Sequence, residues 1–597
     1  MEKISSFRTG ARIKQRNTIP AEQGKYNPPV SLPKLASKLV GVITGSIPGR
    51  TNHTIDMMRH EGIFHDVFSI EAFRALDRLP RLLIIIAPVD LEYKDIARLR
   101  AHVENGNGLI VIGKVLALES LLGIMYKVPD FPFPVGGRGE DSIGEGYAHP
   151  SNDALASSLP AGWWPLHAFG CAPVLCDGAS ILAAYETVHP SSDAWAAITV
   201  NTVGRGSAVQ VAVDISRTTR LVQEGRYVDQ DGIPPPDGLS PVDDGILKCE
   251  DGLVLDWTRD RRLTSPSCKV AAFMVPVADA WRKVMMACIE TIADACAIPV
   301  KRAWYWPGGA EFIGLISHDS DGNDERLARY LLAEIGRAGI HTTWCVEAPG
   351  YSREMCTDIQ AAGHEIALHF DAIAYPAGKQ QDAAGMARLF SRDMLARQLD
   401  EVRRKSGCAS IYSNKNHYTR WAGRTAFFEW CEALGLRVDQ SKGPSKCGTL
   451  GFPFGSCHPW QPTRDDGTLI GCCEIGFQSQ DFGLQGPADT KDDILDAVKR
   501  ANGVAHVIFH PAHAKKDGVN KSMHEFITRA KQLGAVFMTS KEIAEWTFDR
   551  KNVIATGDAT LAGLVVHERD PGRHAWVLVD EQGKRGMQHD VQEKTRN

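Results

Sequence analysis

Apolar and polar residues follow one another in blocks along residues 39–113, in a pattern that predicts strands separated by helices. Short apolar, β-rich runs predict buried strands, and Ile96–Val103 has the apolar spacing of a helix. Continuous apolar strands separated by helices are typical of a parallel sheet that is covered on both faces. The predicted strands are Leu39–Thr44, Asp66–Ile70, Leu83–Ala87 and Leu109–Ile112.

A hairpin joined through Gly204, with strands Ala196–Asn201 and Gly206–Val213, is predicted to close the same domain. The whole pattern resembles the flavodoxin-like fold of the class I glutamine amidotransferase family. An active member needs a nucleophilic cysteine at a strand-to-helix turn, but the corresponding segment, Val111–Val115, has none. The resemblance therefore implies a non-catalytic domain, and we expect it to form homo-oligomers or to shape the substrate site.

Between residues 310 and 548 the strand–helix alternation returns, and polar residues now gather where strands end. The predicted strand Phe312–Ile316 runs into Asp319 and Asp321. Two carboxylates this close to a buried strand are costly unless they bind a metal or each other. A helix N-cap explains one of the two but not both.

Other predicted strands of this region also end in a polar residue. In an α/β barrel, functional groups lie on the loops after the carboxyl ends of strands, so we expect these residues to share one site. His364 lies five residues before His369 on one strand, and we expect the two to point to opposite faces. The residues placed at strand ends are Asp319, Asp321, His369, His417, Asp439 and His510, and His417 follows a strand predicted at Ala409–Tyr412.

Residues 311–546 resemble the polysaccharide deacetylase family, carbohydrate esterase family four, which has a distorted (β/α) barrel. The resemblance is carried by Ser317–Gly322 (SHDSDG), Gly363–His369 (GHEIALH) and Val507–Pro511 (VIFHP). It implies that Asp319 is the catalytic base and His510 the catalytic acid. It also implies that Asp321 and His369 bind a metal.

The chain departs from the family pattern at two positions. Ile373 stands where the family has its second metal-binding histidine, and Lys415 stands where it has an arginine. We expect His417 to be the third ligand, with Asp371 as the rival, and Lys415 to keep Asp319 ionised. Asp439 is expected to orient His510.

One carboxylate and two imidazoles suit a divalent metal with open positions, above all Zn²⁺. The expected function is metal-dependent hydrolysis of a carbon–nitrogen bond, with an N-acetylated sugar or glycoconjugate as the substrate. Two alternatives stay open, a hydrolase of a small cyclic imide or ureide and an inactive barrel that binds carbohydrate or a protein partner.

Composition and charge narrow the class of protein. The chain has 597 residues, 43% of them hydrophobic, and a formal net charge of -5, which disfavours a nucleic-acid binder. No apolar leader core and no run long enough to span a bilayer are present in the sequence, so we expect a cytoplasmic protein. The predicted divisions are a tail (1–37), the amidotransferase-like domain (38–227), an acidic proline-containing linker or arm (228–277), the barrel (278–549) and a small β-containing appendage (550–597).

Overall fold

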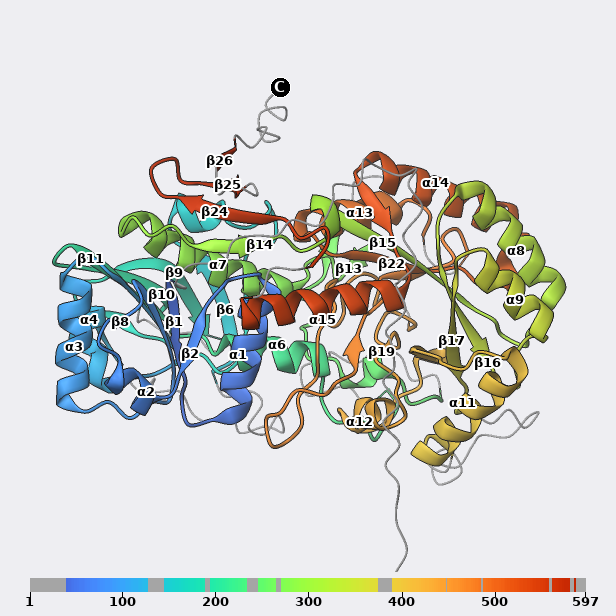
Figure 1. Ribbon diagram of the computed structural model, residues 1–597, viewed down its shortest axis with the longest axis horizontal. Coiled ribbons are helices and arrows are strands. Elements are labelled where there is room, and N and C mark those ends of the chain that lie inside the picture. Colours follow the sequence, from blue (N-terminus) through green and yellow to red (C-terminus); the bar gives the residue numbers. More distant parts are fainter. Residues whose placement is uncertain are drawn as a thin grey trace, which may run out of the picture.

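The computed structural model describes residues 39–126, 144–187, 194–232, 245–264, 270–373, 389–446, 448–484, 487–557, 561–579 and 585–586. The predicted tail and the prolines at 234–236 lie outside these residues. Two large sheets lie side by side with helix α15 (Ser540–Thr556) between them (Figure 1).

The first sheet is mixed, with nine strands in the order β2-β1-β3-β4-β11-β10-β9-β6-β7. Strands β2, β1, β3, β4 and β11 pair in parallel, as the apolar runs predict, and the others extend the sheet antiparallel. The predicted hairpin around Gly204 is β10–β11. The strands are Val40–Ile43 (β1), Asp66–Phe68 (β2), Leu82–Ile86 (β3), Gly108–Ile112 (β4), Gly146–Pro150 (β6), Leu166–Ala168 (β7), Ser180–Thr187 (β9), Ala196–Val203 (β10) and Gly206–Val211 (β11).

Helices pack around this sheet, and the family resemblance of the domain stays a prediction. Helix α7 (Val277–Ala295) packs on β4, β7 and β11. Its buried face carries Trp281, whose indole Nε1 donates a 2.7 Å hydrogen bond to the backbone carbonyl of His167. The longer helices are Pro48–His60 (α1), Tyr93–Glu104 (α3), Ile215–Glu224 (α6) and Val277–Ala295 (α7).

The second sheet is an open, parallel half-barrel in the order β20-β19-β18-β17-β16-β15-β22-β21, and β23 pairs with the start of β15. Its strands are Phe312–Asp319 (β15), Thr343–Glu347 (β16), Glu365–Phe370 (β17), Ser413–Asn416 (β18), Val438–Asp439 (β19), Cys473–Glu474 (β20), Ser479–Gln480 (β21), Val504–Ile508 (β22) and Ala535–Phe537 (β23). The helices between them are Glu325–Ala338 (α8), Arg353–Ala361 (α9), Arg392–Ser406 (α11), Ala426–Ala433 (α12), Thr490–Ala501 (α13) and Asp517–Gln532 (α14).

The strand predicted at Ala409–Tyr412 is wrong, because the observed strand, β18, is the polar segment that follows it. All of its residues are buried. A buried polar strand is stable when each side chain has a partner. The partners are Glu365 for Ser413, Asp439 for Asn414 and Asp319 for Lys415.

Described parts of the segment 228–277, which was predicted as a linker or surface arm, lie against the rim of the half-barrel. Val228 and Gly423 exchange two backbone hydrogen bonds of 3.0 and 2.8 Å, and Lys248 forms a β-bridge with Arg420. A 3-10 helix, Cys249–Gly252 (η3), follows and is mostly buried. We call residues 226–263 the arm; its described part forms a wall of the barrel.

The C-terminal part returns to the first half of the molecule. Strands β24 (Val566–Asp570) and β25 (Ala575–Val579), which match the predicted β-containing appendage, form a sheet with β14 (Lys301–Ala303) and β26 (Arg585–Gly586). Arg569 pairs with Asp294 of α7 at 2.7 Å. Among the described residues, no helix combines the length and the apolar character that a bilayer crossing requires.

Candidate metal centre and its acid and base

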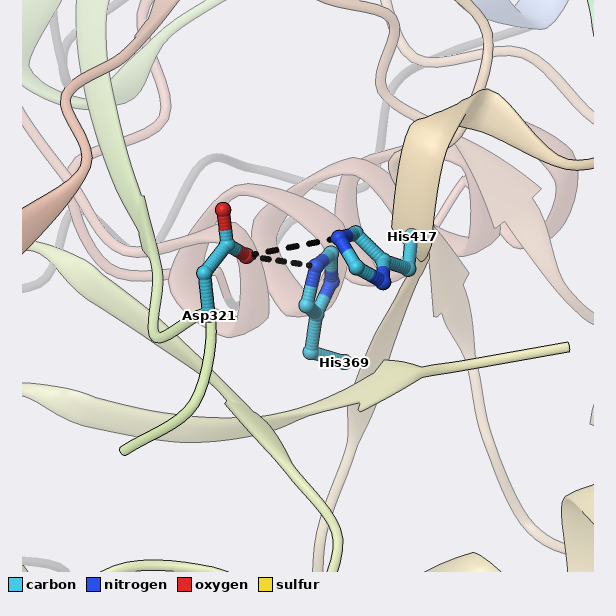
Figure 2. A group of neighbouring side chains, drawn as sticks. All are labelled: Asp321, His369 and His417. Carbon is cyan, nitrogen blue, oxygen red and sulfur yellow. Dashed lines mark ion pairs between the residues drawn. The ribbon is translucent and has the colours of Figure 1, made fainter. Parts of the chain in front are cut away.

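Asp321, His369 and His417 meet at the carboxyl end of the half-barrel. The Oδ1 atom of Asp321 lies 3.3 Å from His369 Nε2 and 3.8 Å from His417 Nε2, and Figure 2 shows both imidazoles turned toward this oxygen. One ligand atom from each residue lies within 4.8 Å of the others. Asp321 follows β15, His369 lies at the end of β17 and His417 follows β18, so parallel strands of one sheet bring all the predicted ligands to one place.

The hydrogen bonding of His369 fixes which of its nitrogens faces Asp321. Its Nδ1 lies 3.1 Å from the backbone carbonyl of Lys415. A carbonyl oxygen can only accept, so Nδ1 carries a proton, and in the neutral imidazole Nε2 presents its lone pair. Nε2 is buried without a hydrogen-bond partner among the described residues. A buried lone pair that faces a carboxylate is the donor set of a cation site, so these residues fit a divalent metal.

Asp371, the rival ligand, contacts the other side of His417. Its Oδ1 lies 3.4 Å from His417 Nδ1, whereas Nε2 faces Asp321. Histidines that bind metals commonly donate their second ring nitrogen to a carboxylate, which fixes the tautomer. The arrangement therefore favours His417 as the ligand and Asp371 as its partner.

Asp319 is buried beside the Lys415 ammonium, which lies 3.3 Å from its Oδ1. Burial favours the neutral carboxyl, but the charge of Lys415 outweighs it and holds the pKa of Asp319 well below its usual range. Lys415 Nζ also donates to Ser317 Oγ, 2.5 Å away, and Ser317 Oγ lies 2.8 Å from His506 Nε2. The predicted Lys415–Asp319 contact is thus present, and Asp319 is ionised at neutral pH.

The carboxylate that contacts His510 is Asp481, not Asp439 as predicted. Asp481 Oδ2 accepts from His510 Nδ1 at 2.6 Å and from His513 Nδ1 at 2.7 Å. Burial opposes protonation of His510, but Asp481 outweighs it and raises the pKa of His510 to about 9. Asp481 follows the short strand β21, which neighbours β22, and sequence reasoning missed it because only the strand order brings it to His510.

Asp439 belongs to a different buried cluster. Its Oδ1 accepts 2.8 Å hydrogen bonds from Asn414 Nδ2 and from Ser441 Oγ. Burial and the adjacent Asp439 carboxylate raise the pKa of Glu474 well above its ordinary value. Asp439 therefore supports the strand ends and does not contact the His510 imidazole.

The acid candidate, His510, lies close to both the base candidate, Asp319, and the candidate ligand Asp321. His510 Nε2 is 3.9 Å from Asp319 Oδ2 and 3.8 Å from Asp321 Oδ2. The site therefore combines an ionised carboxylate, a protonated imidazole and three potential metal ligands. Aromatic residues of the following loops are buried and pack in the core, so they offer no face to a sugar: Phe452, Phe454, Trp460 and Phe477.

No family model and no curated protein matches the sequence. The chain is similar to solved structures of three kinds, each at a TM-score of 0.30 or less.

A Mycobacterium smegmatis protein described as a polysaccharide deacetylase is 16% identical over 42% of this chain and 94% of its own, with a TM-score of 0.30. The Puue allantoinase is 14% identical over 40% of this chain and 92% of its own, with a TM-score of 0.30. A β-galactosidase from Rahnella sp. R3 is 19% identical over 30% of this chain and 29% of its own, with a TM-score of 0.23. At these TM-scores the likenesses identify no family for this chain.

Proposed function

We propose that the protein is a metal-dependent hydrolase that cleaves a carbon–nitrogen bond, with the acetamide of an N-acetylated sugar or glycoconjugate as its substrate. The observation that carries the proposal is the convergence of Asp321, His369 and His417 beside Asp319 and His510. Of these groups, Asp319 has a lowered pKa and His510 a raised one, which are the directions that a general base and a general acid require.

Asp321 Oδ1, His369 Nε2 and His417 Nε2 would hold the metal, and Zn²⁺ suits this ligand set. A bound divalent ion polarises a carbonyl oxygen and lowers the pKa of water near it. Lys415 O and Asp371 keep the two imidazoles in the required orientation through their Nδ1 atoms.

Asp319 is the general base in this proposal. Because Lys415 keeps it ionised, it can accept the proton of the attacking water at neutral pH. His510 is the general acid, since it is protonated at neutral pH and can donate from Nε2 to the leaving nitrogen. Asp481 holds the imidazolium from its Nδ1 side, so Nε2 is the nitrogen that faces the site.

The test is to measure bound metal and acetate release in Asp321→Ala, His369→Ala and His417→Ala. We expect each variant to lose most of its metal and its activity on N-acetylglucosamine oligomers. His364→Asn is the matched control, because His364 immediately precedes β17 and its Nδ1 accepts from Thr342 N on the other side of the strand. Full metal occupancy in all three alanine variants would refute the ligand assignment. Ring opening of cyclic ureides, measured as the carboxylic acid that each cleaved ring bond forms, in place of acetate release would redirect the substrate assignment.

A further inference from the structure

The turn that carries His417 has a strained backbone. It is a single 3-10 turn, His417–Thr419 (η5), in which Tyr418 has φ 54° and ψ 26°. Thr419 follows with φ 52°. Left-handed backbone is unfavourable for non-glycine residues and most of all for a β-branched one. Because the turn starts at His417, its conformation decides where that imidazole points.

The contact that holds this turn comes from the arm. Thr419 Oγ1 donates a 3.0 Å hydrogen bond to Glu250 Oε2. Glu250 has no exposed surface and lies on η3, far from the barrel in sequence. Ser445 Oγ completes the group, 2.8 Å from Thr419 Oγ1 and 3.2 Å from Glu250 Oε2.

The other oxygen of Glu250 binds the loop after β19. Oε1 accepts from the backbone nitrogens of Ser445 and of Lys446, the latter at 2.9 Å, and from Thr449 Oγ1 at 3.5 Å. Backbone N–H groups are fixed donors that stabilise a buried carboxylate. One side chain of the arm therefore ties the turn after β18 to the loop after β19.

Backbone pairing between the arm and the barrel surrounds this carboxylate. Trp421 N donates to Leu247 O at 3.1 Å, just beyond the turn. Arg420 N donates to His417 O at 3.1 Å and closes the turn. Glu250 therefore lies beside the strained residues, and its removal would take from Thr419 the hydrogen bond that ties the turn to the arm.

We propose that Glu250, acting through Thr419, is a positioning residue of the metal centre. It holds residues 417–419 in their left-handed conformation and so keeps His417 Nε2 directed at Asp321. The inference rests on the proposed function, because it gives the arm a role in building the metal-ligand set. It adds that a segment outside the barrel sheet sets the affinity of the barrel for its metal.

The first experiment compares two threonines whose hydroxyls contact the same carboxylate in the full-length protein. Thr419→Val removes the hydrogen bond from the turn to Glu250, whereas Thr449→Val removes a 3.5 Å contact with Glu250 and a 2.7 Å hydrogen bond to Lys446 O, both outside the turn. We expect the dissociation constant for Co²⁺ or Zn²⁺, measured by competition with a chromophoric chelator, to rise about tenfold in Thr419→Val and to stay unchanged in Thr449→Val. Thr419→Ser keeps the hydroxyl and should restore the wild-type value.

The second experiment follows the turn itself without metal. Hydrogen–deuterium exchange of a peptide that contains Arg420 N should be faster in Thr419→Val and in Glu250→Ala than in the wild type, and unchanged in Thr449→Val. Equal exchange and equal metal affinity in all variants would overturn the inference while leaving the metal centre intact. A wild-type protein that binds no metal would refute the proposed function and the metal part of the inference, and exchange would still decide whether Glu250 holds the turn.

Discussion

The backbone carbonyl of Lys415 accepts a hydrogen bond from His369 Nδ1 at 3.1 Å, while the ammonium of the same lysine lies 3.3 Å from Asp319. One residue of β18 therefore sets the tautomer of a candidate metal ligand and the charge of the candidate base. A substitution of the Lys415 side chain leaves its backbone carbonyl, and so the hydrogen bond to His369, in place. The two roles can therefore be separated by mutation.

Lys415→Met should abolish the charge that keeps Asp319 ionised. We expect kcat to fall by roughly 100-fold or more, and the acidic limb of the pH profile of kcat/KM to move to higher pH because the pKa of Asp319 rises. Metal content should stay near that of the wild type, since the carbonyl that orients His369 remains. Lys415→Arg, which keeps the charge, should recover part of the activity; an unchanged acidic limb in Lys415→Met would contradict the role of Lys415.

Asp481→Asn should shift the alkaline limb of the pH profile of kcat/KM to lower pH. His510 acts while protonated, and Asp481 raises its pKa to about 9, so loss of the carboxylate charge lowers that pKa. We expect the alkaline limb of kcat/KM to move down by roughly one to three pH units. Asp439→Asn is the control, because Asp439 contacts Asn414 and Ser441 instead of His510. A shift of the alkaline limb in Asp439→Asn and none in Asp481→Asn would show that Asp439, and not Asp481, raises the pKa of His510.

His167 makes the stability of the first domain depend on pH. It is fully buried between Asp260 (2.7 Å) and Glu145 (3.2 Å). Burial opposes its charge, but Asp260 and then Glu145 outweigh burial and raise the pKa of His167 from 6.5 to about 9. The folded-state pKa lies above the unfolded one, so the stabilisation is complete below pH 6.5 and disappears as the pH rises through about 9.

His167→Gln should therefore lower the stability by roughly 3 kcal/mol at about pH 6 and by much less at about pH 10. The measurement is the difference in thermal midpoint between the variant and the wild type at the two pH values. A difference that does not change with pH would show that His167 is neutral in the folded protein.

Arg550 of α15 connects the two halves of the molecule. Its guanidinium donates to the carbonyls of His60 (2.9 Å), Ala303 (2.9 Å) and Trp304 (2.6 Å). Arg550→Met leaves these buried acceptors unsatisfied, so we expect a loss of ~3 kcal/mol or more in the free energy of unfolding. Arg573→Met, at a side chain that is 65% exposed, should have little effect in the same denaturation experiment.

The strands that could be predicted are those whose buried side chains are mainly apolar. Leu82–Ile86 and Val504–Ile508 are wholly buried, and the hydrophobic runs in their sequences predict them as strands. β18 could not be found in the same way, because Ser413–Asn416 is polar and is stabilised by partners that lie far away in the sequence. The predicted strand, Ala409–Tyr412, consequently starts four residues before the observed strand, Ser413–Asn416.

The convergence of Asp321, His369 and His417 could be predicted because each stands at or just after the end of its own strand, and parallel strands end at one edge. The partner of His510 could not, because it depends on which strands are neighbours. Asp439 is on β19, several strands from β22, whereas Asp481 follows β21, which pairs with β22. Glu250 was missed for a related reason, since nothing in the composition of the arm shows that one of its acids enters the barrel wall.

The arm and helix α15 have a consequence for how the chain can be divided. A fragment that starts at residue 278 lacks Glu250, and the carbonyls that Arg550 binds include one from α1. Neither half is self-contained. A barrel grafted onto another scaffold would keep Asp321, His369 and His417 but would lose Glu250, which contacts the turn after β18. Protein engineering therefore has to treat the arm, the barrel and the first domain as one unit.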